Sequence, residues 1–307
     1  MRSNNGITRR DWLRGAIAVG ALAASGAGMS APTPIKRAIP SSGELLPVIG
    51  LGTYQTFDAG STPSERAPLR EVLREFVDLG GSMLDSSPMY GRSEEVAGDL
   101  AAELGVQKKL FHATKIWTSG REGGLAQMER SFRRMRVAHM DLMQIHNLVD
   151  WRTHLATLRE WKQQGKIRYL GVTHYTDSAY DELERVLNAE ALDFVQLNFS
   201  IVERAAEKRL LPLAMERRVA VIANRPFAQA GLFSKVRGKD LPPWAEEFDC
   251  DSWAQFFLKF IVSHSAITCV IPATGNVKHL RENMYAGTGR LPDATMRERM
   301  ARHVASL

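Results

Sequence analysis

Four polar residues that could together perform acid–base chemistry stand at, or just after, the end of short apolar runs. Asp85 ends the run SMLD, Tyr90 follows it in SSPMYG, Lys115 ends LFHATK, and His146 ends MDLMQIH. A tyrosine can donate a proton, a lysine can tune it, an aspartate can balance the lysine, and a neutral histidine can polarise an oxygen atom. This set suits the addition of a hydride and a proton to a carbonyl group.

The apolar runs recur along the chain and alternate with amphipathic patterns, which indicates how the four residues are positioned. Strands are predicted near residues 48–52, 82–85, 110–115, 140–145, 167–172, 194–197, 219–223 and 267–271. Because a helix or long loop follows each one, we predict an α/β fold, a single-domain (β/α)8 TIM barrel. Active sites of such barrels lie at the C-terminal ends of the strands, where the four residues fall. The irregular stretch 228–251 is predicted to be a lid or substrate loop.

The composition fits one folded domain and excludes several other classes of protein. The 307 residues are 44% hydrophobic and 24% charged, which is enough for a sizeable core. The two cysteines, Cys250 and Cys269, can form at most one bridge and no disulfide framework. The net charge of +6 is small, and no basic face carries interleaved aromatic residues, so we expect no nucleic-acid partner. No metal site is predicted.

Residues 1–31 have the pattern of a targeting segment. Arg9 and Arg10 precede the weakly apolar run AIAVGALAASGAGMSA, and together they resemble a twin-arginine export signal. That run is too short and too rich in glycine and serine to form a stable membrane span. A disordered basic tail is the alternative. An export signal predicts a periplasmic protein that meets the twin-arginine export machinery, with residues 32–47 as a linker and 48–307 as the barrel.

The motifs between residues 48 and 287 resemble those of the aldo/keto reductase family in order and spacing. They are GLGTYQ, LDSSPMYGRSEEVAG, ATK, MDLMQIHN, GKIRYLGVTHY, DFVQLN and IPATGNVKHLREN. Each motif is weak alone, but the ordered set is specific. The resemblance implies a barrel that binds an extended nicotinamide nucleotide and interconverts a small carbonyl compound, an aldehyde or ketone, with an alcohol. No complete G-x-G-x-x-G follows a predicted strand, which agrees with a fold that lacks a Rossmann domain.

Each of the four residues has an expected role in this chemistry. Tyr90 is the expected proton donor, because an ordinary tyrosine has a pKa of about 10 and is protonated at neutral pH. The ammonium of Lys115 is expected to lower the pKa of Tyr90, and Asp85 is expected to pair with Lys115. His146 is expected to donate a hydrogen bond to the substrate oxygen. A structural ion pair and a core histidine are the alternatives.

The residues expected at the nicotinamide depart partly from the family pattern. By resemblance, Thr173 and His174 occupy the positions of a usual Ser-Asn pair, and with Gln196 they would bind the nicotinamide carboxamide. Asn224 stands where the family usually has a tyrosine that stacks on the nicotinamide ring. The neighbouring Arg225 is expected to cover the ring in part, or else to be a solvated loop charge.

The resemblance also implies where the adenosine end of the nucleotide binds. The residues predicted there are Thr274, Lys278, Glu282 and Asn283. The family's usual lysine and arginine for the 2′-phosphate correspond to Ala273 and His279. Backbone N–H groups at a helix N-terminus could still bind phosphate. We therefore expect NADP as the cofactor, with NAD possible.

Three functions are compatible with the sequence. The leading one is an NAD(P)-dependent oxidoreductase with Tyr90 as proton donor. A Schiff-base aldolase would use Lys115 as its nucleophile, although Asp85 should keep that lysine charged. The third is an exported barrel that serves as a nucleotide-binding or sensor subunit without turnover, since free nucleotide is scarce outside the cytoplasm.

Overall fold

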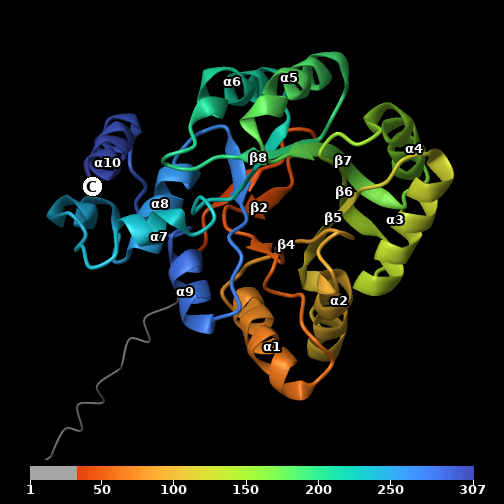
Figure 1. Ribbon diagram of the computed structural model, residues 1–307, viewed down its shortest axis with the longest axis horizontal. Coiled ribbons are helices and arrows are strands. Elements are labelled where there is room, and N and C mark those ends of the chain that lie inside the picture. Colours follow the sequence, from red (N-terminus) through yellow and green to blue (C-terminus); the bar gives the residue numbers. More distant parts are fainter. Residues whose placement is uncertain (1–32) are drawn as a thin grey trace, which may run out of the picture. The chain divides into compact units, whose positions relative to one another are not determined.

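A computed structural model describes residues 33–307, and its centre is a sheet of eight parallel strands (Figure 1). The strands are β3 (Leu51–Gly52), β4 (Met83–Asp85), β5 (Phe111–Ile116), β6 (Met140–His146), β7 (Ile167–His174), β8 (Phe194–Asn198), β9 (Ala220–Asn224) and β10 (Ile267–Val270). Each strand pairs with the next one along the chain. Parallel bridges from Ile49 to Val270 and from Gly52 to Ala273 join the two ends of the sheet. The predicted single-domain (β/α)8 barrel is therefore confirmed.

At least one helix follows every barrel strand, and the helices surround the strands (Figure 1). The α-helices are α1 (Pro63–Asp78), α2 (Ser93–Leu104), α3 (Arg121–Met135), α4 (Trp151–Gln163), α5 (Tyr180–Ala189), α6 (Leu210–Glu216), α7 (Gly231–Lys235), α8 (Trp253–Val262), α9 (Val277–Tyr285) and α10 (Ala294–Ser306). Short 3-10 helices are η2 (Gln107–Lys109), η3 (Asp177–Ala179), η4 (Ala205–Lys208) and η5 (Pro243–Phe248). In α1, Leu69, Val72, Leu73 and Phe76 are buried, a spacing that presents one apolar stripe to the core.

Side chains alternate along each strand between the barrel interior and the helical layer, and this alternation positions the polar residues. Phe111 and Ala113 of β5 and Met83 of β4 belong to the apolar cluster inside the barrel. Two residues further along the same strands stand Lys115 and Asp85, which are also buried. Apolar side chains thus fill the N-terminal part of the interior, and polar side chains occupy its C-terminal end.

A two-stranded hairpin precedes the barrel and covers the N-terminal end of its interior. β1 (Lys36–Ala38) pairs in antiparallel register with β2 (Leu45–Pro47). Ile39 and Leu46 are buried in the same apolar cluster as the inward residues of the strands. The hairpin therefore closes this end of the barrel interior with apolar side chains.

The stretch 228–251 is more regular than the sequence predicts. It contains α7 and η5. Trp244 of η5 packs in a tilted arrangement against the ring of Phe256, at 5.7 Å between centroids, and lies beneath the guanidinium of Arg299 at 4.3 Å. These contacts anchor that part of the segment to α8 and α10. The expectation of an irregular segment was therefore wrong for η5, because aromatic packing fixes it to the outer layer. The role of the stretch as a lid or substrate loop stays a prediction.

Three sequence expectations concern the chain as a whole. Cys250 and Cys269 are both buried and unpaired, so they form no bridge. Within residues 33–307, no helix has both the length and the apolar character needed to cross a membrane. The predicted export signal, residues 1–31, lies outside the described part of the chain.

Candidate active site

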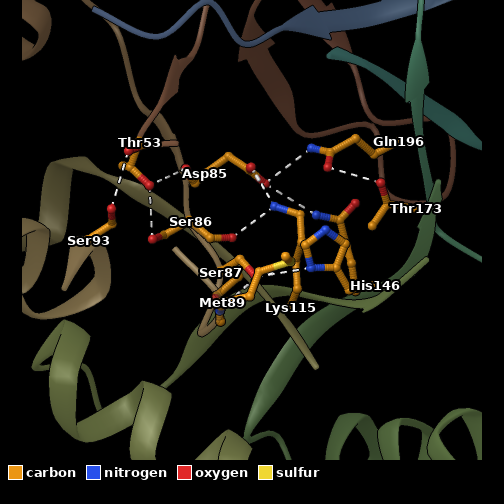
Figure 2. A network of polar contacts seen from close by, with 12 residues as sticks. Thr53, Asp85, Ser86, Ser87, Met89, Ser93, Lys115, His146, Thr173 and Gln196 are labelled. Atoms are coloured by element: carbon orange, nitrogen blue, oxygen red, sulfur yellow. Dashed lines mark hydrogen bonds and ion pairs between the residues drawn. The ribbon is translucent and has the colours of Figure 1, made fainter. Parts of the chain in front are cut away.

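The four residues singled out in the sequence come together at the C-terminal end of the barrel. Asp85 ends β4, Lys115 lies on β5, and His146 ends β6, so three adjacent strands supply three of them (Figure 2). The Lys115 Nζ atom donates to Asp85 Oδ2 at 2.6 Å and lies 5.3 Å from the centre of the Tyr90 ring. The rings of Tyr90 and His146 meet edge to face, with 5.9 Å between their centroids.

A buried hydrogen-bond network holds the second carboxylate oxygen of Asp85. Asp85 Oδ1 accepts from Gln144 Nε2 at 3.3 Å and from Gln196 Nε2 at 3.2 Å. Thr173 Oγ1 in turn donates to Gln196 Oε1 at 3.1 Å (Figure 2). The carboxylate is therefore fixed on both sides, and five consecutive strands, β4 to β8, contribute to its position.

Lys115 is charged although it is fully buried. Burial by itself lowers the pKa of a lysine, but attraction by Asp85 and Tyr90 outweighs burial, and the pKa of Lys115 is raised. Its ammonium also donates to the carbonyl oxygen of Ser86 at 2.8 Å. The structure thus places one fixed positive charge beside the tyrosine ring.

Burial and Lys115 shift the pKa of Tyr90 in opposite directions. Burial raises the pKa of Tyr90, the attraction of Lys115 lowers it, and the net shift is upward. Lys115 therefore acts on the pKa of this tyrosine in the predicted direction, but burial outweighs it. Tyr90 is protonated at neutral pH, as a proton donor must be.

His146 is a neutral imidazole, as the sequence suggested. Burial, Lys115 and His174 lower the pKa of His146 from 6.5 to about 3. Its Nδ1 atom lies 3.0 Å from Ser87 Oγ. Among the described residues, no atom is hydrogen-bonded to its Nε2 atom, so this nitrogen remains available for a substrate oxygen.

The residues expected at the nicotinamide lie on β7 and β8, at the end of β9 and directly after it. Thr173 and Gln196 already belong to the network around Asp85, and His174 is half-buried beyond Thr173. Asn224 Oδ1 is shielded from solvent and has no hydrogen-bond partner within residues 33–307. Arg225 has a left-handed backbone with φ of 52°, and its guanidinium stands over the Tyr175 ring at 5.8 Å.

The residues expected at the adenosine end lie on and before α9. Asn276 caps this helix by accepting from the backbone N–H of Lys278 at 2.8 Å, and Thr274 Oγ1 accepts from the N–H of Asn276 at 3.1 Å. Lys278 is exposed, whereas Arg281 is bound to Glu75 of α1 at 2.6 Å.

Glu282 and Asn283 follow on the same helix, with Glu282 partly exposed and Asn283 buried. The expected residues of this end are thus gathered in one short helix and the loop that leads into it.

Sequence reasoning missed several residues of the site. Gln144 binds Asp85, and its signal was a lone polar residue two positions before His146 in an apolar strand. Ser87 contacts His146, and nothing in its type distinguished it from Ser86. Glu94 is fully buried and accepts from Thr114 Oγ1 at 2.6 Å, which ties α2 to the strand that carries Lys115.

Large apolar side chains are exposed in the loops around the four residues. They are Tyr54 after β3, Met89 after β4, Trp117 after β5 and Tyr175 after β7. The Tyr54 and Tyr90 rings are 4.9 Å apart. A hollow of about 560 Å³ lies at the opposite end of the barrel, next to Pro40 and Arg218, and none of the four residues lines it.

A family model and known relatives match this chain. The model of the aldo/keto reductase family matches residues 48–301. Methylglyoxal reductase YeaE of Escherichia coli is 27% identical over 257 residues, covering 81% of this chain and 88% of the relative. Aldo-keto reductase YhdN of Bacillus subtilis is 26% identical over 203 residues, covering 61% and 60%.

Solved structures share the fold. An aldo/keto reductase of Klebsiella pneumoniae, in complex with NADP and acetate, has a TM-score of 0.73 at 23% identity and covers 85% of this chain and 93% of its own. The glycerol dehydrogenase of Gluconobacter oxydans has a TM-score of 0.71 at 21% identity, with 91% and 96% covered. Given the family match over most of its length, the chain belongs to the aldo/keto reductase family and is an NAD(P)H-dependent oxidoreductase.

Proposed function

We propose that this protein interconverts a small carbonyl compound and its alcohol, with Tyr90 as the proton donor to the carbonyl oxygen. The observation that carries the proposal is the placement of the buried Asp85–Lys115 pair beside Tyr90, with neutral His146 facing the same tyrosine. In the reducing direction a carbonyl oxygen held between Tyr90 and His146 receives the tyrosine proton. In the oxidising direction the same oxygen returns it.

Each supporting residue has a physical task in this step. The charge on Lys115 stabilises the negative oxygen that Tyr90 acquires as its proton leaves. Asp85 keeps that lysine charged inside the barrel. His146 donates from Nε2 to the substrate oxygen and so orients the carbonyl group for attack.

The residues present fit a nicotinamide nucleotide. Bound there, the nucleotide would supply the hydride for the carbonyl carbon. Asn224 Oδ1, which has no hydrogen-bond partner within residues 33–307, offers a polar contact for a carboxamide, as do Thr173 and Gln196. At the other end, the N-terminus of α9 and the charge of Lys278 suit a phosphate.

NADP(H) is the proposed nucleotide, with NAD(H) as the competitor. The Klebsiella pneumoniae structure was solved with NADP, which supports this choice. Ala273 and His279 provide no fixed positive charge for a 2′-phosphate, and Arg281 is engaged by Glu75. Lys278 is therefore the expected contact to that phosphate.

The substrate is proposed to be a neutral carbonyl compound with an apolar part. Exposed Tyr54, Met89 and Trp117 surround the entrance, and such side chains favour apolar over charged groups. The name of the Escherichia coli relative, a methylglyoxal reductase, supports a small dicarbonyl compound as the first one to try.

The protein is proposed to act in the periplasm after export by the twin-arginine machinery. The paired Arg9 and Arg10 before a weakly apolar run support this location. Fractionation of cells that express the full chain tests it, with an Arg9→Lys, Arg10→Lys double variant as control. Equal amounts of both proteins in the periplasm would contradict the proposal.

Nucleotide binding and turnover test the function together. NADPH and NADH are titrated by fluorescence into the full chain and into Tyr90→Phe, and turnover of methylglyoxal is followed at 340 nm. We expect Tyr90→Phe to bind NADPH as the parent does and to lose turnover by at least about a hundredfold. Substantial turnover by the variant would remove Tyr90 from its role. Tight binding without turnover of a broad carbonyl panel by the parent would favour the nucleotide-binding or sensor subunit.

A further inference from the structure

Ser87 contacts two of the four site residues although sequence reasoning did not identify it. Its side chain is fully buried, and its Oγ atom lies 3.0 Å from His146 Nδ1 (Figure 2). Its carbonyl oxygen accepts from the backbone N–H of Tyr90 at 3.0 Å. Ser87 therefore touches the proposed proton donor through its backbone and the proposed polarising group through its side chain.

The direction of the Ser87–His146 hydrogen bond follows from the partners within reach. Ser87 Oγ accepts from the backbone N–H of Met89 at 3.4 Å, and this is its other contact among residues 33–307. A neutral imidazole carries one N–H group. If that group were Nδ1–H, the hydroxyl proton of Ser87 would lack an acceptor in a buried position, which is unfavourable. The arrangement that satisfies both groups has Ser87 donating to Nδ1, so the ring proton resides on Nε2.

We propose that Ser87 is a positioning residue, which holds His146 in the tautomer that carries its proton on Nε2. The Nε2 atom has no partner in the described part of the chain, so its N–H group is free to donate to a substrate oxygen. The other tautomer would present a lone pair to that oxygen and repel it. The expected effect on turnover rests on the proposed function, whereas the assignment of the tautomer does not.

The tautomer can be read without turnover, by ¹⁵N NMR of the histidine rings in the full chain at pH 7. The chain has eight histidines, and the resonances that vanish in His146→Gln identify those of His146. We expect an unprotonated nitrogen shift for Nδ1 and a protonated one for Nε2. In Ser87→Ala, the Nδ1 atom loses its donor, and we expect a larger share of the Nδ1–H form.

Kinetic measurements distinguish a role of Ser87 in positioning His146 from a general effect on the stability of the protein. We expect Ser87→Ala to lower kcat about tenfold, the worth of one hydrogen bond, and to leave NADPH binding unchanged. Ser87→Thr retains the hydroxyl and should keep the Nε2–H form. Ser131→Ala is the matched control, since Ser131 is also fully buried, lies on α3 and makes no side-chain hydrogen bond within residues 33–307. It should match the parent in tautomer and kcat.

Two results would overturn the inference. One is a parent spectrum with the His146 proton on Nδ1. The other is a Ser87→Ala protein whose tautomer and kcat equal those of the parent. An inactive parent with the Nε2–H form would instead reject the proposed function and leave the assignment of Ser87 intact.

Discussion

Replacing Asp85 with asparagine would remove one charge from the buried ion pair while preserving the shape of the side chain. Lys115 Nζ lies 2.6 Å from Asp85 Oδ2, and both side chains are almost completely buried. At an effective dielectric constant of about 20, the attraction across this distance is about 6 kcal/mol before desolvation is counted. Breaking a buried pair on one side costs about 3–5 kcal/mol, because an unpaired charge remains inside. We expect Asp85→Asn to lose that much unfolding free energy at pH 7.

The pH dependence of this loss follows from the pKa of Lys115. In the parent this pKa is raised above the unfolded value, so the pair stabilises the protein at neutral pH and ceases to do so as pH rises through the folded pKa. Without Asp85, burial dominates, and the pKa of Lys115 falls below its ordinary value. A neutral lysine is tolerated in the barrel. The stability gap between parent and variant should therefore be wide at pH 7 and smaller at pH 10.

Urea unfolding followed by tryptophan fluorescence at pH 7 and pH 10 measures the gap, and kcat is measured at pH 7. We expect kcat to fall at least about a hundredfold, since Lys115 would no longer carry a fixed charge beside Tyr90. Glu160→Gln is the control, because it removes a carboxylate from an exposed pair with Arg121 at 2.7 Å and should change stability little. Equal stability of Asp85→Asn and the parent at pH 7, or a gap of the same size at both pH values, would refute the reasoning.

Four further outcomes are expected, two for His146 and one each for Gly98 and Glu94. Because the folded pKa of His146 is about 3, kcat/KM should show no titration of this residue between pH 5 and 8. Its neutral burial should also make the parent lose stability on acidification from pH 6.5 towards 3, and in urea unfolding His146→Gln should lose less over that window. Gly98→Ala should destabilise by about 1–3 kcal/mol in urea, since its Cβ would stand 2.1 Å from the Arg134 carbonyl oxygen, and an unchanged midpoint would contradict this contact. Glu94→Leu leaves the buried Thr114 hydroxyl without its acceptor and should cost about 1–3 kcal/mol, with a lower kcat because that strand carries Lys115.

The barrel could be predicted because each of its strands has a residue pattern that is visible in a short stretch of sequence. Runs such as LFHATKI and MDLMQIH are mostly apolar because a barrel strand is covered on both faces, and amphipathic helices separate them. The predicted positions of β5 and β6 agree with the structure to within a residue or so. The helices of 228–251 escaped prediction, because α7 and η5 are short and depend on packing, of α7 on α8 and of η5 on α8 and α10.

Within the site, the sequence identified the residues whose chemical types are rare inside a barrel. A lysine or an aspartate at the end of an apolar strand is conspicuous, so Lys115 and Asp85 could be found. Gln144 and Ser87 could not be singled out, since a glutamine or serine has many ordinary uses. Their partners, Asp85 and His146, are 59 residues away in each case, and the folded barrel brings them together.

By itself the sequence determined the order of strands and helices and the placement of Asp85, Lys115 and His146 at strand ends, because both follow from residue type and spacing. Tertiary structure alone decided the electrostatic state of these groups. Burial raises the pKa of Tyr90 against the pull of Lys115 and lowers the pKa of His146 to about 3. Desolvation depends on how completely distant segments enclose a group, and that enclosure exists only once the barrel has closed.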